Sequence, residues 1–348
     1  MMERTFNFAE AMKPIWDDGG IAYCESVAKV ETAPGEALIP LYYHADEILS
    51  VQSADLLTTY TEGKDYVLEN GCLRILKDGA ISCLTLDEAY PKVEGERTYR
   101  GRNGIAYLLF SEGTFFHERQ LAVTYRHSDA WRGPIPAEKT QVLPKLAEKL
   151  RNKTPFTFLI YGDSITAGGN ASACTGIAPY LPRFGELFAE HLSAQTGTEI
   201  NVVNTAVGGM DARWGRDNAE ERVAAYKPDL VLIGFGMNDG SGHCGQEEFA
   251  DRIRAIIETT RKTNPDCEFI LVTSISANPE VCLFGTQAEC AEGMRSLAGE
   301  GIAIADMMPI HTELLKTKRY IDMTGNNVNH PNDYLHRTYA QVVYALMP

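Results

Sequence analysis

The chain has 348 residues, of which 44% are hydrophobic and 23% are charged, a composition typical of a folded globular protein and not of a disordered one. Its formal net charge of −15 argues against nucleic acid or an anionic membrane as a partner, since both are polyanions. A chain of this length is long for one domain, so we expect about two.

Several kinds of segment are absent from the sequence. Residues 1–10 include Glu3, Arg4 and Glu10 and no apolar core of the kind that a secretory signal needs. No stretch approaches the roughly 18 consecutive apolar residues of a membrane-spanning helix. The eight cysteines form no C-x-x-C pair and do not have the sequence spacing of metal ligands. We therefore expect a soluble cytoplasmic protein with reduced thiols, no metal, no organic cofactor and no membrane partner.

The first half of the chain has the pattern of β structure. Short β-rich runs cover residues 37–43, 47–51, 66–69, 73–76, 105–110 and 120–125. Hairpin-type turn signals, such as Asn70-Gly71 and Asp78-Gly79, separate several of these runs. This pattern predicts an all-β domain, a sandwich or a jelly roll, over residues 1–130. It contains no cluster of residues that suggests chemistry.

Residues 131–153 have the pattern of a linker. Gly133, Pro134 and Pro136 interrupt regular structure near its start. Residues 143–153 have the amphipathic pattern of a short helix. The linker leads into a second half, residues 154–348.

Strand and helix patterns alternate along this second half. Strands are predicted at residues 156–161, 199–203, 230–235, 268–273 and 301–305, and helices at 181–196, 212–226, 246–263, 287–298 and 335–346. Strands that alternate with helices favour a parallel, doubly wound sheet covered on both faces. We therefore predict an α/β domain with the architecture of a three-layer α/β/α sandwich.

Four polar blocks stand near the ends of predicted strands or in loops of the second half. The first ends in Ser164, directly after the first strand; the others contain Gly208 and Gly209, then Asn238, then His330. Ligands bind outside the carboxyl ends of the strands in such sheets, so a serine displayed there is a candidate nucleophile. Taken alone, this serine also fits a turn that caps a helix.

With these four blocks in this order, residues 154–348 resemble the SGNH hydrolases, also called the GDSL esterase/lipase family, which are named for a Ser, a Gly, an Asn and a His. The resemblance implies a flavodoxin-like α/β/α fold and an ester hydrolase, with Ser164 as nucleophile and His330 as general base. The backbone N–H groups of Ser164 and Gly209 and the amide of Asn238 would form the oxyanion hole. Gly209 is preferred to Gly208 because the oxyanion glycine ends the family's second block.

The block that contains His330 departs from the family pattern at one position. The family usually has an aspartate three residues before the histidine, where this chain has Asn327. A literal D-x-x-H occurs at Asp333 to His336. However, Asn332 or Asp333 is typical of the N-cap of the last helix, which would put His336 in the first turn. We therefore keep His330 as the general base.

The group that orients His330 stays open on the sequence alone. One hypothesis, which we favour, is a Ser-His dyad with a backbone carbonyl as the orienting group, as in some carbohydrate esterases of this superfamily. A second is a carboxylate from elsewhere, with Asp333 or Asp322 as near candidates. A third is Asn327 itself, although an amide offers no charge to the imidazolium. A fourth is that catalytic activity has been lost.

A β domain before an SGNH domain resembles carbohydrate esterases that remove acetyl groups from sugars. We therefore expect a serine esterase that acts on a small-molecule or oligosaccharide ester. The alternatives are a short-chain acyl-ester or thioester hydrolase, lipase-like in its chemistry, and a catalytically impaired carbohydrate-binding protein. The sequence does not indicate which sugar is bound or what the oligomeric state is.

Overall fold

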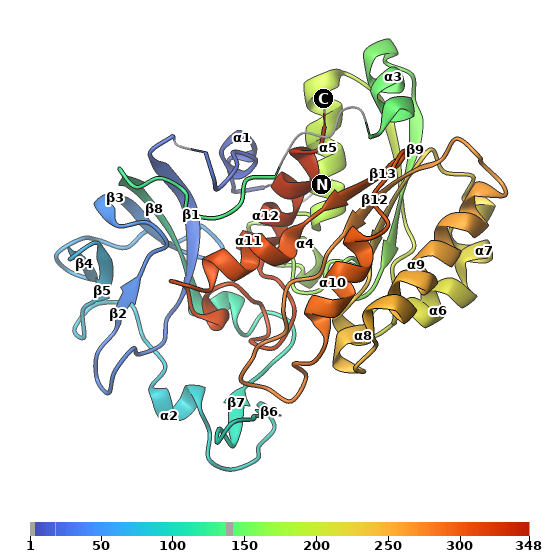
Figure 1. Cartoon of the computed structure of the whole chain (residues 1–348). Coiled ribbons are helices and arrows are strands. Elements are labelled where there is room, and N and C mark those ends of the chain that lie inside the picture. Colours follow the sequence, from blue (N-terminus) through green and yellow to red (C-terminus); the bar gives the residue numbers. More distant parts are fainter. Residues whose placement is uncertain (1–3, 18, 137–141, 348) are drawn as a thin grey trace.

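The computed structural model describes residues 4–17, 19–136 and 142–347. The chain forms an antiparallel β region, up to residue 127, and an α/β region, from residue 144 onward (Figure 1). Residues 1–3, 18, 137–141 and 348 lie outside the described residues, and with them part of the predicted linker. The domain boundaries at residues 130 and 154 stay a prediction.

The α/β region is built on one five-stranded sheet. Its strands are β9 (Phe156–Gly162), β10 (Ile200–Asn204), β11 (Leu230–Gly234), β12 (Glu268–Val272) and β13 (Ile302–Ala305), in the order β10-β9-β11-β12-β13. All pairings in this sheet are parallel. The predicted doubly wound parallel sheet is confirmed, because each strand predicted in this half is present.

Helices cover both faces of the parallel sheet (Figure 1). Alternate side chains of a strand point to opposite faces, so β9 contributes to two core clusters. Phe158 and Ile160 share one cluster with α3 (Pro144–Asn152), α5 (Phe184–Thr196), α11 (Met307–Leu314) and α12 (Asp333–Tyr344). Leu159 and Tyr161 share the other with α6 (Ala212–Asp217), α9 (Gln246–Arg261) and α10 (Gln287–Arg295). The three-layer sandwich is thereby confirmed.

The predicted helix over residues 212–226 is divided in the structure. It consists of α6, α7 (Ala219–Arg222) and a 3-10 turn at Ala224–Tyr226. The side chain of Asn218 donates to the carbonyl oxygen of Trp214 at 2.8 Å, and such local bonds compete with the helical hydrogen bonds of the backbone. Two further short helices, α4 (Ser172–Thr175) and α8 (Met237–Ser241), follow strands β9 and β11.

The β region consists of three small antiparallel sheets. The first contains β1 (Ile21–Ala28), β8 (Gln120–His127) and β3 (Ala45–Ser53); the second contains β2 (Leu38–Pro40), β5 (Cys72–Ile75) and β4 (Tyr66–Glu69); the third is the hairpin of β6 (Thr98–Arg100) and β7 (Tyr107–Leu109). Short helices α1 (Phe8–Ala11) and α2 (Leu86–Ala89) accompany them. The predicted β character of this half is confirmed.

Strand β1 was not predicted, and its irregularity explains why. Its pairing with β8 shifts register between Ala22 and Glu25, and Cys24 between them has φ 44°. Glu25 and Ser26 are buried polar residues, so the strand lacks a clean alternation of apolar and polar positions. The bulge and the buried polar residues therefore interrupt the alternating pattern from which a strand is predicted.

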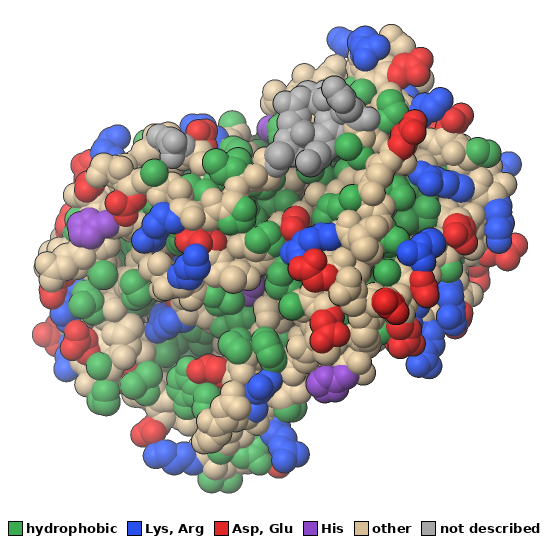
Figure 2. Space-filling model, viewed as in Figure 1, with side chains coloured by type: hydrophobic (Ala, Val, Ile, Leu, Met, Phe, Trp, Pro, Cys, Tyr) green, Lys and Arg blue, Asp and Glu red, His purple; other side chains and the backbone are tan. Residues whose placement is uncertain are grey.

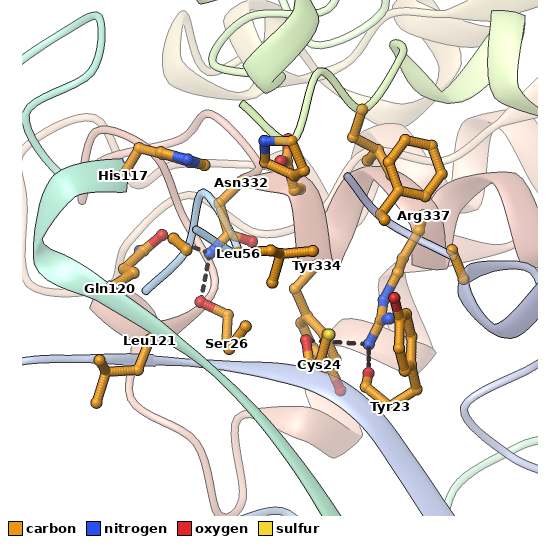
Figure 3. Close-up of a pocket in the computed structure, with 17 residues that line it drawn as sticks. Tyr23, Cys24, Ser26, Leu56, His117, Gln120, Leu121, Asn332, Tyr334 and Arg337 are labelled. Carbon is orange, nitrogen blue, oxygen red and sulfur yellow. Dashed lines mark hydrogen bonds between the residues drawn. The ribbon is translucent and has the colours of Figure 1, made fainter. Parts of the chain in front are cut away.

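The β region packs directly on the α/β region. Val27 and Tyr125 belong to the same core cluster as Leu335 of α12. Figure 3 shows a pocket at this junction: Asn332 donates to Ser26 Oγ at 2.9 Å, and Arg337 donates to the carbonyl oxygen of Tyr23. The two regions therefore share one core, and polar contacts also cross between them.

The surface carries intermixed charges. On the face drawn in Figure 2, Lys and Arg side chains are interspersed with Asp and Glu, without a continuous basic stripe. Within the described residues, no helix is both long enough and apolar enough to cross a membrane. The eight cysteines are all unpaired, as the sequence predicts.

Candidate active site

The structure brings the predicted nucleophile and the predicted base together. Nε2 of His330 lies 2.9 Å from Oγ of Ser164, although the two residues are 166 positions apart in the chain. Ser164 begins the turn that follows β9, and His330 lies in the loop before α12. Both side chains are partly exposed, so an incoming substrate can reach them.

The turn that carries Ser164 is tightly built. A Cβ added to Gly162 would lie 2.1 Å from the carbonyl oxygen of Gly234, so only glycine fits where β9 meets β11. Oδ1 of the buried Asp163 accepts the N–H of Ile165 at 3.0 Å, which closes the turn. These contacts hold Ser164 at the carboxyl edge of the sheet.

The three predicted oxyanion donors lie in the segments that follow β9, β10 and β11. Within the described part of the chain, the N–H groups of Ser164 and Gly209 have no hydrogen-bond partner, so they are available to a substrate oxygen. Gly209 has φ 78°, a conformation that favours glycine. The side-chain amide of Asn238, in α8, donates to the carbonyl oxygen of Met210 at 2.9 Å, which ties α8 to the loop that contains Gly209.

The other nitrogen of the imidazole faces Asn170. Oδ1 of Asn170 lies 2.9 Å from Nδ1 of His330. The amide nitrogen of Asn170 donates to the carbonyl oxygens of Gly113 and Gly325, each at 3.1 Å, so the amide oxygen must face the ring. Nδ1 is therefore the protonated nitrogen, and Nε2 keeps a lone pair that can accept a hydrogen bond from the Ser164 hydroxyl.

A carboxylate from the β region also reaches Nδ1. Oε2 of Glu112, in the loop after β7, lies 3.2 Å from Nδ1 of His330, and Oε1 accepts a bond from Asn326 at 2.9 Å. Partial desolvation, although the side chain is largely exposed, acts to raise the pKa of Glu112. The hydrogen bond and charge of His330, together with the Asn326 bond, outweigh that effect and lower the pKa.

The orienting groups suggested by the sequence have other partners. Nδ2 of Asn327 donates to the carbonyl oxygen of Leu109 at 3.0 Å, and Asp333 accepts the N–H of Ser172 at 2.8 Å. Asp322 accepts the N–H of Ala28 at 2.7 Å. None of the three is hydrogen-bonded to His330 in the described structure, and no backbone carbonyl there accepts from Nδ1. Side-chain oxygens of Asn170 and Glu112 occupy that position instead.

The literal D-x-x-H histidine is not part of this arrangement. Asn332 is the N-cap of α12, as predicted, and His336 lies within the helix. Nε2 of His336 lies 3.1 Å from the carbonyl oxygen of Gly169, and the side chain is fully buried. Burial lowers the pKa of His336 to about 4, so the ring stays neutral near neutral pH.

Reasoning from the sequence missed Asn170 and Glu112. Asn170 follows Gly168 and Gly169 soon after the Ser164 block, so an amide close to the nucleophile was the available signal. Glu112 lies 218 positions before His330, in a region without any chemical motif. Only the packing of the β region on the α/β region brings Glu112 to the site.

Comparisons with known proteins give one family match and several similar structures. Residues 160–338 match the model of the GDSL-like Lipase/Acylhydrolase family. No curated protein matches the sequence.

Similar solved structures of low sequence identity include esterases and a hydrolase. A two-domain esterase active on acetylated mannans, co-crystallised with mannopentaose, is 20% identical, with 61% of this chain and 54% of that chain covered and a TM-score of 0.48. This chain thus spans about half the length of that esterase. An acetylxylan esterase from Geobacillus stearothermophilus is 23% identical, with 54% and 92% covered and a TM-score of 0.45. An alpha/beta hydrolase from the metagenome of Lake Arreo, Spain, is 20% identical, with 55% and 96% covered and a TM-score of 0.44.

Proposed function

This chain belongs to the GDSL-like lipase/acylhydrolase family, and we propose that it is a serine esterase that removes acetyl groups, or similarly short acyl groups, from carbohydrate. The observation that carries the proposal is the 2.9 Å contact between Nε2 of His330 and Oγ of Ser164. An acceptor on the far side of the ring keeps Nε2 unprotonated, so the histidine is ready to take the hydroxyl proton.

The proposed reaction proceeds in two steps. Oγ of Ser164 attacks the ester carbonyl while Nε2 of His330 takes its proton, and the oxyanion binds the N–H groups of Ser164 and Gly209 and the amide of Asn238. His330 then protonates the leaving alcohol oxygen, which leaves an acyl-serine. In the second step a water gives its proton to Nε2 and attacks the acyl-serine. Release of the acid returns the proton to Oγ.

Polar side chains around the base support a hydroxyl-rich alcohol as the leaving group. Glu112 and Asn329 are partly or largely exposed beside His330, and Asn326 links them by donating to both. Amide and carboxylate groups of this kind can bind sugar hydroxyls. A long acyl chain needs apolar surface instead. The resemblance to carbohydrate esterases that carry a β domain points to the same substrate class.

Turnover of p-nitrophenyl acetate at neutral pH tests the esterase proposal. Ser164→Ala is expected to reduce kcat by about 10⁴-fold or more, because the nucleophile is lost. Ser82→Ala, at an exposed serine of the β region, is the matched control and should keep wild-type turnover. Wild-type turnover no higher than that of Ser164→Ala would reject the esterase and favour a carbohydrate-binding protein.

Acyl-chain selectivity tests the substrate class. Wild-type protein is expected to prefer a sugar acetate to p-nitrophenyl butyrate and octanoate when kcat/KM values are compared. A preference for octanoate or for an acyl thioester would contradict the carbohydrate assignment while keeping the serine mechanism.

A further inference from the structure

We propose that Glu112, a residue of the β region, is the positioning residue that supplies the negative charge beside His330, so that the site is completed across the two regions of the chain. The inference rests on the proposed esterase function and deepens it. Sequence position 327 lacks the usual aspartate of the family, and three features of the site favour Glu112 in its place.

The first feature is that Glu112 is the carboxylate at the imidazole. Of the ionisable groups around His330, Asp163 lies behind the Ser164 turn, where Oδ1 accepts backbone N–H groups, and His336 is bonded to a backbone carbonyl. Neither is hydrogen-bonded to the imidazole of His330, and each interacts with it only electrostatically. Asn170 contacts Nδ1 directly but carries no charge. In the described structure, Oε2 of Glu112 is the one carboxylate oxygen within hydrogen-bond distance of Nδ1.

The second feature is that the position of Glu112 is fixed through Asn326. Oδ1 of Asn326 accepts the backbone N–H groups of Val328, Asn329 and His330, each at 3.0 Å. Its amide nitrogen must therefore point away from these donors, and it donates to Oε1 of Glu112 at 2.9 Å. The same asparagine thus shapes the His330 loop and holds the carboxylate against the ring. The contact between Glu112 and His330 is therefore part of a hydrogen-bond network centred on Asn326.

The third feature is that two more amides bind the loop that carries Glu112. Asn170 donates to the carbonyl oxygen of Gly113, and Asn327 donates to that of Leu109. An aspartate at position 327 has no donor and would face a carbonyl oxygen, which is unfavourable. The asparagine at this position therefore fits a site whose acid is supplied by Glu112 and whose position 327 anchors the loop.

The division of roles follows from the chemistry of the two acceptors. Asn170 selects the tautomer of His330. Glu112 stabilises the imidazolium that forms when Ser164 gives up its proton, and no proton passes to the carboxylate. Because the Glu112 side chain is 53% exposed, solvent and salt screen its charge.

Steady-state kinetics with p-nitrophenyl acetate tests the inference through Glu112→Gln. Glutamine keeps one oxygen that can accept from Asn326, so the contact with the loop is retained, whereas the charge and the carboxylate oxygen that faces Nδ1 are lost. An aspartate-to-asparagine change in a serine protease costs about 10⁴-fold. For this exposed carboxylate we expect a smaller loss of kcat, about 10- to 100-fold, with KM unchanged. Glu96→Gln, at an exposed glutamate of the same region, is the control and should match wild type.

Salt dependence separates charge from a merely structural role. Wild-type kcat is expected to fall about two- to fivefold between low salt and about 1 M NaCl, whereas kcat of Glu112→Gln should change little. Equal kcat in Glu112→Gln and Glu96→Gln would overturn the inference and leave the esterase intact. A loss of kcat with a raised KM and unaltered salt dependence would also overturn it. Wild-type turnover no higher than Ser164→Ala would reject the esterase itself.

Discussion

Asp163 directly precedes Ser164, the proposed nucleophile, and is 2% exposed. Burial raises its pKa from 3.8 to about 7; the N–H groups of Ile165 and Thr166 oppose this rise, and the charge of Asp239 adds to it. The pKa in the folded protein is thus above that in the unfolded chain. Stability from the protonated carboxyl is fully present below about pH 4 and is lost as the pH rises through about 7.

Asp163→Asn is expected to stabilise the protein at alkaline pH. The asparagine oxygen can still accept the Ile165 N–H, and the side chain no longer has to ionise in a buried site. We expect unfolding to require about 1–3 kcal/mol more than in wild type at about pH 8, with the gain fading toward about pH 4. Thermal melts over this pH range measure the difference. An equal difference at both ends of the range would refute the burial argument.

At the scale of elements, Asn332 fixes the start of α12, two residues after His330. Oδ1 of the N-cap Asn332 accepts the N–H of Leu335 at 3.3 Å. Its amide nitrogen donates to Ser26 Oγ at 2.9 Å and to Gln120 Oε1 at 3.0 Å, both in the β region. Figure 3 shows these side chains converging at the junction. One residue therefore caps the helix and joins it to the first antiparallel sheet.

Asn332→Ala is expected to destabilise the protein by about 2–4 kcal/mol. It removes the cap and leaves the buried oxygen of Gln120 without this donor. Urea denaturation measures the change. Asn201→Ala, at an exposed position of β10, is the control and should change stability by less than about 0.5 kcal/mol. Equal stability of the two variants would show that Asn332 has no special structural role.

The strands of the parallel sheet and helix α11 differ in how well a sequence pattern predicts them. The strands of the parallel sheet were predicted because β11 and β12 are buried along their whole length and, apart from Glu268 at the start of β12, consist of apolar residues and glycine. Helix α11 was not predicted. Its Pro309 suggests a break, but a proline in the first turn of a helix replaces an N–H that has no intrahelical partner.

For the whole molecule, a buried ion pair joins the two regions. Nζ of Lys318 lies 2.6 Å from Oε1 of Glu25, with side chains 0% and 3% exposed. Lys318 also donates to the carbonyl oxygen of Ser26 at 2.8 Å, and Glu25 accepts from the hydroxyl of Tyr125 at 2.6 Å. Because each charge has an oppositely charged partner and further hydrogen bonds, both are tolerated between β1 and the C-terminal part of the chain.

Lys318→Met is expected to destabilise the protein by about 3–5 kcal/mol, because Glu25 would remain buried without its countercharge. The double variant Lys318→Met/Glu25→Gln should recover part of that loss. Lys262→Met, at an exposed lysine, is the control. Chemical denaturation of the four proteins gives the comparison. A double variant no more stable than Lys318→Met would argue against the charge as the cause.

The sequence by itself determined the fold class and the candidate nucleophile and base. Local patterns carry this information: apolar runs that alternate with amphipathic segments specify a parallel sheet covered by helices. The block that ends in Ser164 follows a strand, and His330 precedes a helix cap. Ser164 lies at the carboxyl edge of the parallel sheet, where such folds bind ligands, and the choice of His330 rested on the resemblance of its block to the SGNH hydrolases.

Only the tertiary structure decided what faces the other side of His330. Asn170 has φ 63°, and its amide is oriented by carbonyl oxygens from two distant loops. Glu112 reaches the ring from the β region, 218 residues away in the chain. No local pattern encodes such contacts, because they depend on how two separately patterned regions pack and on which amide donors meet across their junction.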